Sequence, residues 1–189
     1  LVGNNKKKDI AQILEEYFAA KGPEQEVPVV SEVIDINHTK EYEDLTIHKV
    51  NEHTRAYIKI QDGCNQFCSY CIIPYTRGRI RSKNPEEVIE EVKNLAAQGY
   101  KEIVLTGIHL SSYGKDLGTV NLLDVIKRIQ QIEDVERIRL GSLEPRIITE
   151  EFVKELVKCD KVCPHFHLSL QSGCDETLKR MNRKYTTEE

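Results

Sequence analysis

The chain has 189 residues, of which 39% are hydrophobic and 31% charged, and its formal net charge is −4 at pH 7. This length and apolar content suffice to bury the core of one domain, or of one domain and part of another. No run approaches the roughly 18 apolar residues of a membrane helix, and no signal-peptide pattern opens the chain, so we expect a cytoplasmic protein without a membrane partner. The acidic balance excludes nucleic-acid binding driven by bulk charge, so an RNA contact requires a local basic patch.

The N-terminal part of the chain is expected to belong to a neighbouring domain and a linker. A helical stripe of apolar residues covers 10–18, with Asn4 or Asn5 as its N-cap, and Gly22 ends it. The following residues contain short β-branched runs and prolines without a helical period. The chain opens without Met and stops where a helix pattern begins, so we expect a fragment. The expected parts are the C-terminal end of a preceding α/β domain (1–23), a linker with short strands (24–53), and a core domain that is incomplete at its C-terminus (54–189).

From residue 54, β-rich runs alternate with amphipathic helical patterns. Strands are expected at 55–60, 102–105, 137–140 and 165–170. Helices are expected at 85–97, 121–131, 149–158 and 175–181. Four βα units in series predict an α/β fold with a parallel sheet, or a partial TIM-like (β/α) barrel, whose working face lies at the C-terminal ends of the strands.

Three of the six cysteines are concentrated directly after the first predicted strand. Cys64, Cys68 and Cys71 follow a C-x3-C-x2-C spacing, which differs from the dispersed cysteines of a secreted disulfide scaffold. Three thiolates on a four-iron cluster leave one iron open, whereas a structural zinc site closes its coordination with four protein ligands. The spacing therefore predicts a 4Fe-4S cluster that can bind a substrate. The alternatives are cysteines that only pack, or a zinc site completed by His53, His165 or His167.

This loop resembles a known family. A C-x3-C-x2-C loop with an aromatic residue before its third cysteine is the signature of the radical S-adenosylmethionine (SAM) superfamily. The segments GCNQFCSYCIIPYTRGRIRSK, EIVLTGIHLSSYG, IRLGSLEP and HFHLSLQSGCDETLKRMNRKYT resemble the methylthiotransferases within it. They are most similar to the branch that acts on N6-threonylcarbamoyladenosine in tRNA. The resemblance is dense over 54–189, and 1–22 look like the end of that family's N-terminal domain.

The resemblance implies a 4Fe-4S cluster on the three cysteines, S-adenosyl-L-methionine as cofactor, tRNA as substrate, and an electron donor such as flavodoxin or ferredoxin. The reaction would insert a methylthio group at C2 of the modified adenosine beside the anticodon. The family also carries a second 4Fe-4S cluster on cysteines of its N-terminal domain, and this chain has no cysteine before Cys64. The alternatives are a sister branch acting on isopentenyladenosine in tRNA or on a ribosomal-protein aspartate, or a zinc-stabilised RNA-binding module without catalysis.

Polar residues at the strand ends are expected to hold SAM, and Tyr70, just before the third cysteine, is expected to lie against its adenine. Residues that only cap a neighbouring helix would occupy similar positions. The expected cofactor contacts are Tyr70, Thr106, Gly107, Ser142, Glu144, Ser169 and Gln171.

A basic run follows the cysteines. Four cations stand within seven residues, at Arg77, Arg79, Arg81 and Lys83, in an otherwise acidic chain. This run predicts a contact with tRNA phosphates. The alternative is a solvated surface run.

Overall fold

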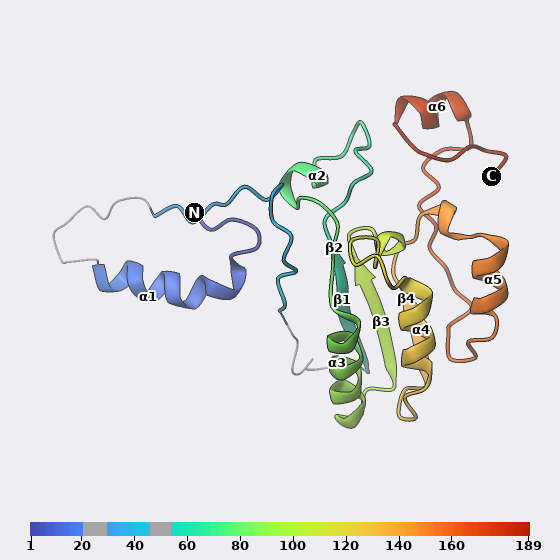
Figure 1. Cartoon of the computed structure of the whole chain (residues 1–189), viewed down its shortest axis with the longest axis horizontal. Coiled ribbons are helices and arrows are strands. Elements are labelled where there is room, and N and C mark those ends of the chain that lie inside the picture. Colours follow the sequence, from blue (N-terminus) through green and yellow to red (C-terminus); the bar gives the residue numbers. More distant parts are fainter. Residues whose placement is uncertain (21–29, 46–53) are drawn as a thin grey trace.

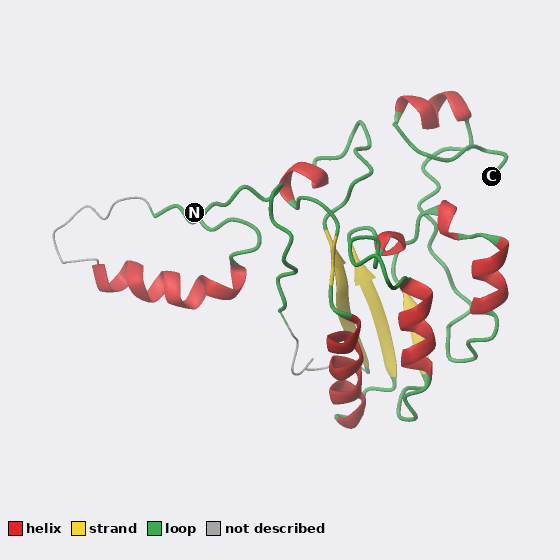
Figure 2. Cartoon of the chain, in the orientation of Figure 1, coloured by secondary structure: helices red, strands yellow, loops and turns green. Residues whose placement is uncertain are grey.

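The computed structural model describes residues 1–20, 30–45 and 54–189 (Figures 1 and 2). Its centre is a four-stranded sheet in the order β2-β1-β3-β4. The strands β1 (Arg55–Asp62), β3 (Glu102–Gly107) and β4 (Arg137–Leu140) run parallel, and the short β2 (Arg81–Ser82) pairs antiparallel with β1. The three predicted parallel strands are thus confirmed, and their C-terminal ends meet at one edge of the sheet.

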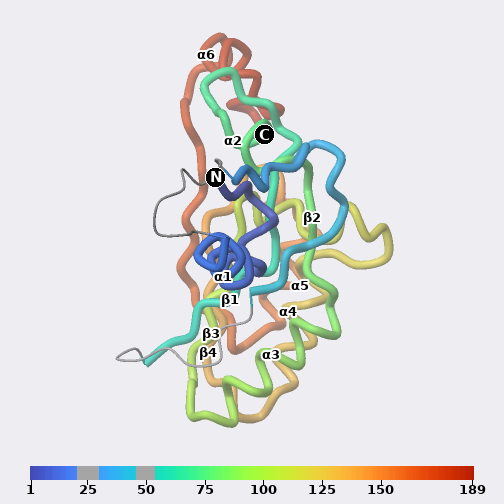
Figure 3. Tube along the Cα trace, turned by 90° about the vertical axis from the view of Figure 1, so that its left-hand side faces the viewer, coloured from blue at the N-terminus to red at the C-terminus, as the bar shows by residue number. Residues whose placement is uncertain are grey.

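Three helices cover one face of this sheet: α3 (Pro85–Ala97), α4 (Leu122–Gln130) and α5 (Glu150–Leu156) (Figures 1 and 3). Each begins at a side-chain cap. Asn84 accepts the N–H of Glu86, Asn121 forms a capping box with Asp124, and Thr149 accepts the N–H of Phe152. These caps explain why the predicted starts of the helices are close to those in the structure.

The core lies between these helices and the sheet. Alternate residues of β1, among them Ile58 and Ile60, are fully buried against Val92 and Ile126. Burying one such side chain contributes roughly 1.5–3 kcal/mol. The intervening residues face the opposite side, where Tyr57 is 44% exposed. Within the described part of the chain no helix packs on that polar face.

The fourth predicted strand, over 165–170, is not a regular strand. The chain pairs in parallel with its neighbour at only two separate points, Val162 with Ile138 and Leu168 with Leu143. Pro164 lies between these points and has no N–H to continue a ladder. The segment still runs beside β4, so a curved partial barrel remains, and α6 (Asp175–Arg180) follows it.

Residues 1–20 lie to one side of the sheet (Figure 1). The 3-10 turn η1 (Lys7–Asp9) leads into α1 (Ile10–Ala20), which buries no residue. The N-cap predicted at Asn4 or Asn5 was wrong, because η1 starts after Lys6 without a side-chain cap. A parallel bridge joins Val2 to Glu32. The predicted stop at Gly22 and most of the predicted linker strands lie outside the described residues.

The remaining short elements frame the upper edge of the sheet: α2 (Ile73–Thr76), and the 3-10 turns η2 (Leu110–Ser112) and η3 (Pro145–Ile147). None of the helices in the described ranges is both long and apolar enough to span a bilayer.

Candidate metal and cofactor site

The three clustered cysteines lie in residues 63–71, here called the cysteine loop, directly after β1. Gly63 starts the loop with a φ of 71°, and a Cβ at this position would lie 1.8 Å from the carbonyl oxygen of Arg79. Only glycine fits this close approach. The N–H of Cys64 then donates to the carbonyl of Gly78 over 3.0 Å, and the N–H of Cys71 donates to that of Cys68 over 3.0 Å. The backbone therefore folds the three thiols into one compact turn.

The thiols share a sheltered environment. Cys64 and Cys68 are 8% and 9% exposed, and Cys71 is half-buried. Burial raises the pKa of the Cys64 thiol, and negative charge on Cys68 and Cys71 raises it further, against a backbone N–H from Gln66 that lowers it. Binding of a cation would relieve this mutual repulsion, because thiolates are the form that ligates metals. Three soft donors from one loop suit an iron–sulfur cluster.

No group of three or more His, Cys, Asp or Glu side chains within the described ranges converges on a point suited to a single metal ion. The histidines named for the zinc alternative fall in different places. His167 shares a hydrogen bond with Ser142 at 3.1 Å, His165 is exposed, and His53 lies outside the described residues.

The segment after α6 supports the cysteine loop from above. Arg183 donates from Nη1 to Sγ of Cys68 over 3.3 Å and from Nη2 to the carbonyl of Ser169 over 3.2 Å. Asn182 donates to the carbonyl of Phe67, whose φ of 52° is unusual for a non-glycine residue. Neither Arg183 nor Asn182 was predicted as a site residue. The only signal was their place in the segment HFHLSLQSGCDETLKRMNRKYT, which resembles the methylthiotransferases.

Gln61 joins the cysteine loop to the loop after β3. Its fully buried side chain donates from Nε2 to the carbonyls of Asp62 and Gly63, and its Oε1 accepts the N–H of His109, each at 2.7 Å. Gly107 makes room for it, since a Cβ there would lie 2.9 Å from the Gln61 side chain. Sequence reasoning missed Gln61 because a glutamine at a strand end carries no distinctive pattern.

The residues predicted to hold SAM are only partly gathered at one edge. Thr106 and Gly107 end β3, and Ser142 lies just beyond the neighbouring end of β4. The hydroxyl of Thr106 already donates to the carbonyl of Ile58 over 3.1 Å. Tyr70 is 55% exposed beside the thiols. Gln171 is also exposed and takes a positive φ of 63°, whereas Ser169 is partly buried with its carbonyl held by Arg183. Their contact with SAM stays a prediction.

Glu144 occupies the most sheltered position among these residues, with 6% of its surface exposed. Its Oε2 lies 3.5 Å from Nε2 of both Gln66 and His109, and its backbone N–H donates to Oγ of Ser111. Burial alone would raise the pKa of Glu144, but the hydrogen bond and charge of His109 outweigh it, so the pKa lies below its ordinary value. The carboxylate is therefore the stable form beside the cysteine loop.

The basic run divides into a buried half and an accessible half. Arg81 is 1% exposed and donates to the carbonyls of Arg77 and Arg79. Lys83 is 2% exposed, and its Nζ lies 2.6 Å from Asp44 and 2.7 Å from Glu91. The expectation that these two cations meet tRNA phosphates was therefore wrong, because their charges are enclosed by the protein.

The other two cations remain near the surface. Arg77 is partly exposed and binds Oδ1 of Asn4 at 3.1 Å. Arg79 is exposed, and its guanidinium lies 4.5 Å above the ring of Phe67. A contact of this pair with RNA stays a prediction.

Comparisons with known proteins agree with this geometry. The sequence model of the Radical SAM superfamily matches residues 58–189. The chain is 40% identical over all its residues to the threonylcarbamoyladenosine tRNA methylthiotransferase MtaB of Bacillus subtilis, and 42% identical to that of Aquifex aeolicus. It is 45% identical, over 77% of its length, to the tRNA-2-methylthio-N(6)-dimethylallyladenosine synthase of Clostridium botulinum. It spans 41%, 44% and 32% of these relatives.

Solved structures share the fold. The radical SAM methyltransferase TsrM from Kitasatospora setae, with cobalamin and a [4Fe-4S] cluster bound, superposes with a TM-score of 0.55. The match has 22% identity and covers 70% of this chain and 26% of that one. The cobalamin-dependent radical SAM enzyme OxsB gives 0.58 at 13% identity, over 98% and 29% of the two chains. Since the superfamily model covers more than half of its residues, this chain belongs to the radical SAM superfamily.

Proposed function

We propose that this chain is the radical-generating part of a tRNA methylthiotransferase. The observation that carries the proposal is the cysteine loop: three thiols at C-x3-C-x2-C spacing, with Cys68 bound by Arg183, at the C-terminal edge of a parallel sheet. The tRNA methylthiotransferase and the 2-methylthio-adenosine synthase named above match the whole chain and 77% of it, respectively. The domain division at residues 23 and 53 is part of this proposal.

In the proposed site, Cys64, Cys68 and Cys71 hold a 4Fe-4S cluster with one open iron. When bound, this cluster supplies the electron that cleaves SAM and so generates the radical. The chain's own residues shape the site. Arg183 holds its positive charge beside the sulfur of Cys68, and Gln61 fixes the start of the cysteine loop. Tyr70, Thr106, Gly107, Ser142, Ser169 and Gln171 are proposed to orient SAM.

The proposed substrate is tRNA carrying N6-threonylcarbamoyladenosine, methylthiolated at C2. The full-length protein would need a second 4Fe-4S cluster on residues outside this chain, and an electron donor such as flavodoxin or ferredoxin in the cytoplasm. A dimethylallyladenosine substrate is the second candidate, because the relatives of that activity reach 46% identity.

The test uses the full-length protein that contains this chain, reconstituted anaerobically with iron and sulfide. We expect a brown protein that releases deoxyadenosine from SAM under reduction and forms a 2-methylthio nucleoside in tRNA. Mass spectrometry of the nucleosides separates the two candidate substrates. Stoichiometric zinc without visible absorbance, or no deoxyadenosine, would refute the proposal. Cys64→Ala should abolish both products, while Cys174→Ala, an exposed thiol outside the cysteine loop, serves as the matched control.

A further inference from the structure

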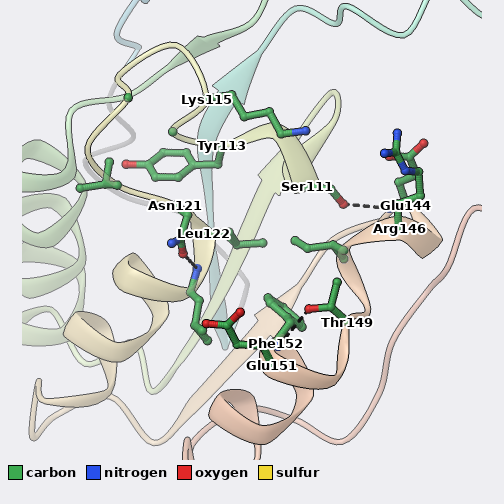
Figure 4. A pocket seen from close by; sticks show the side chains of 15 residues that line it. Ser111, Tyr113, Lys115, Asn121, Leu122, Glu144, Arg146, Thr149, Glu151 and Phe152 are labelled. Carbon is green, nitrogen blue, oxygen red and sulfur yellow. Dashed lines mark hydrogen bonds between the residues drawn. The ribbon is translucent and has the colours of Figure 1, made fainter. Parts of the chain in front are cut away.

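A cavity of about 510 Å³ opens between the loop after β3 and the segment that leads into α5 (Figure 4). The buried apolar side chains of Leu122 in α4 and Phe152 in α5 form part of its wall. Glu144 also lines it, and two exposed cations, Lys115 and Arg146, lie at its border. The cavity therefore combines an apolar wall, one sheltered carboxylate, the exposed carboxylate of Glu151 and two positive charges.

One buried polar atom and two charged side chains of this cavity lack a hydrogen-bond partner in the described part of the protein. Oε1 of Glu144 has no hydrogen-bond partner, although only 6% of the residue's surface is exposed. Within the described ranges, the side chains of Lys115 and Arg146 make neither a hydrogen bond nor an ion pair, although the charge of Arg146 contributes to the lowered pKa of Glu144. Buried polar atoms are normally hydrogen-bonded, so an unpartnered carboxylate oxygen at a cavity wall points to a ligand that donates to it.

The arrangement specifies the chemistry of that ligand. A carboxylate accepts from N–H or O–H groups, and guanidinium and ammonium groups bind an anion. The two candidate substrates differ in this respect at the N6 substituent. A threonylcarbamoyl group carries N–H and O–H donors and a carboxylate, whereas a dimethylallyl group is a hydrocarbon.

We propose that this cavity receives the N6 substituent of the substrate adenosine and selects one that bears a carboxylate, an inference that rests on the proposed function. Glu144 accepts a hydrogen bond from the substituent, and Arg146 and Lys115 pair with its carboxylate. Glu144 is also 3.5 Å from Gln66 of the cysteine loop, so the cavity adjoins the site where the radical is generated. This assigns Glu144 to the substrate, in place of the SAM contact expected from the sequence.

Selection follows from the cost of unpaired groups. A dimethylallyl substituent entering the cavity would offer no donor to Oε1 of Glu144 and no anion to Arg146 and Lys115. Sites built to hydrogen-bond a substrate reject an analogue that lacks the bonding group much more strongly than an apolar pocket distinguishes ligands that differ by one methylene. The cavity therefore discriminates by hydrogen bonding and charge.

Binding to short RNAs tests this without turnover. The full-length protein is titrated with anticodon stem-loops that carry threonylcarbamoyladenosine, dimethylallyladenosine or unmodified adenosine. We expect the first to bind more tightly, and Arg146→Gln or Lys115→Gln to reduce that preference about tenfold. Glu144→Gln, which keeps the side-chain volume, should reduce it as well. Lys93→Gln is the matched control, because it removes one exposed charge on α3, away from the cavity.

Two results would overturn the inference. A variant that weakens binding of all three RNAs equally would show that the cations meet phosphates, and variants with an unchanged preference would show that the cavity does not read the substituent. The proposed function fails separately, through absence of deoxyadenosine and of a methylthio product. The melting temperature of each variant verifies that it is folded.

Discussion

Arg183 donates a hydrogen bond to the sulfur of Cys68 over 3.3 Å, although 115 residues separate the two in the chain. The same guanidinium lies 5.1 Å from the ring of Tyr185. Burial lowers the pKa of Arg183, but its interactions with Cys68 and Tyr185 raise it by more, so the pKa lies above its ordinary value and the side chain stays charged. A permanent positive donor is thus held against one of the three sulfurs.

Replacing Arg183 by alanine should weaken retention of the 4Fe-4S cluster and shift the midpoint potential of the cluster to a more negative value. Hydrogen bonds and positive charge at the sulfurs stabilise the reduced state, so their loss disfavours reduction. Iron content and a spectroscopic redox titration of the reconstituted protein measure both effects. Arg180→Ala removes an exposed arginine of α6 and should change neither. Equal potentials in the two variants would contradict the role of Arg183.

Two glycines with positive φ offer a direct test of the turn that starts the cysteine loop. Gly63 (φ 71°) and Gly99 (φ 95°) both take a conformation that costs an L-residue about 1–2 kcal/mol, but nothing lies within 4 Å of a Cβ added at Gly99. Gly99→Ala should lose about that amount of unfolding free energy. Gly63→Ala should lose more, because its Cβ meets the backbone of Arg79. Urea denaturation compares them, and equal losses would show that the loop accommodates the extra atom.

The accessible half of the basic run should contribute to RNA binding. Arg79→Gln is expected to weaken tRNA binding by the full-length protein and to reduce the dependence of log K on log salt by about one unit. Lys83→Met should leave that slope unchanged and lower the melting temperature, because it leaves Glu91 buried without its cation. Lys93→Gln, at an exposed position on α3, is the surface control. A slope that falls with Lys83→Met would contradict its enclosure.

Glu102 should make stability depend on acidic pH. Burial would raise its pKa, but hydrogen bonds from Arg139 and Arg137, both at 3.0 Å, hold the pKa below the ordinary value of 4.5. A lowered carboxyl pKa stabilises the fold above its unfolded value, and this stabilisation is lost as pH falls through the folded value.

Glu102→Gln should therefore flatten the decline of the unfolding free energy between about pH 5 and about pH 3. Urea denaturation at each pH measures this free energy. Glu136→Gln removes a 57% exposed carboxylate at the same end of the sheet and should leave the decline intact. Curves of equal slope for wild type and Glu102→Gln would contradict the prediction.

Local signals accounted for much of the fold. The Asn84-Pro85 start of α3 and the Asn121 cap of α4 are encoded within a few residues, and the strands β1, β3 and β4 carry contiguous β-rich runs. The segment over 165–170 has a similar composition, but a strand also needs a continuous partner. That partner contact is interrupted at Pro164, which only the three-dimensional structure reveals.

The sequence did not indicate which charged side chains of the candidate site are buried, or which distant residues they contact. Four cations in a row look alike in sequence, yet Lys83 finds its carboxylates on Asp44, 39 residues before it, and on Glu91 in α3. Likewise, nothing near Cys68 in the chain indicates the approach of Arg183. Such contacts depend on which distant segments fold together, and this information is absent from a local pattern.

One amide group gives the site its rigidity before any ligand arrives. Because the side chain of Gln61 binds both Gly63, the first residue of the cysteine loop, and the backbone of His109, neither loop can shift without breaking one of these hydrogen bonds. The entropy of ordering these loops is lost when the chain folds, so iron, cofactor and substrate would meet an arrangement that is already in place. Loading and turnover would then require little rearrangement of the backbone at this edge of the sheet.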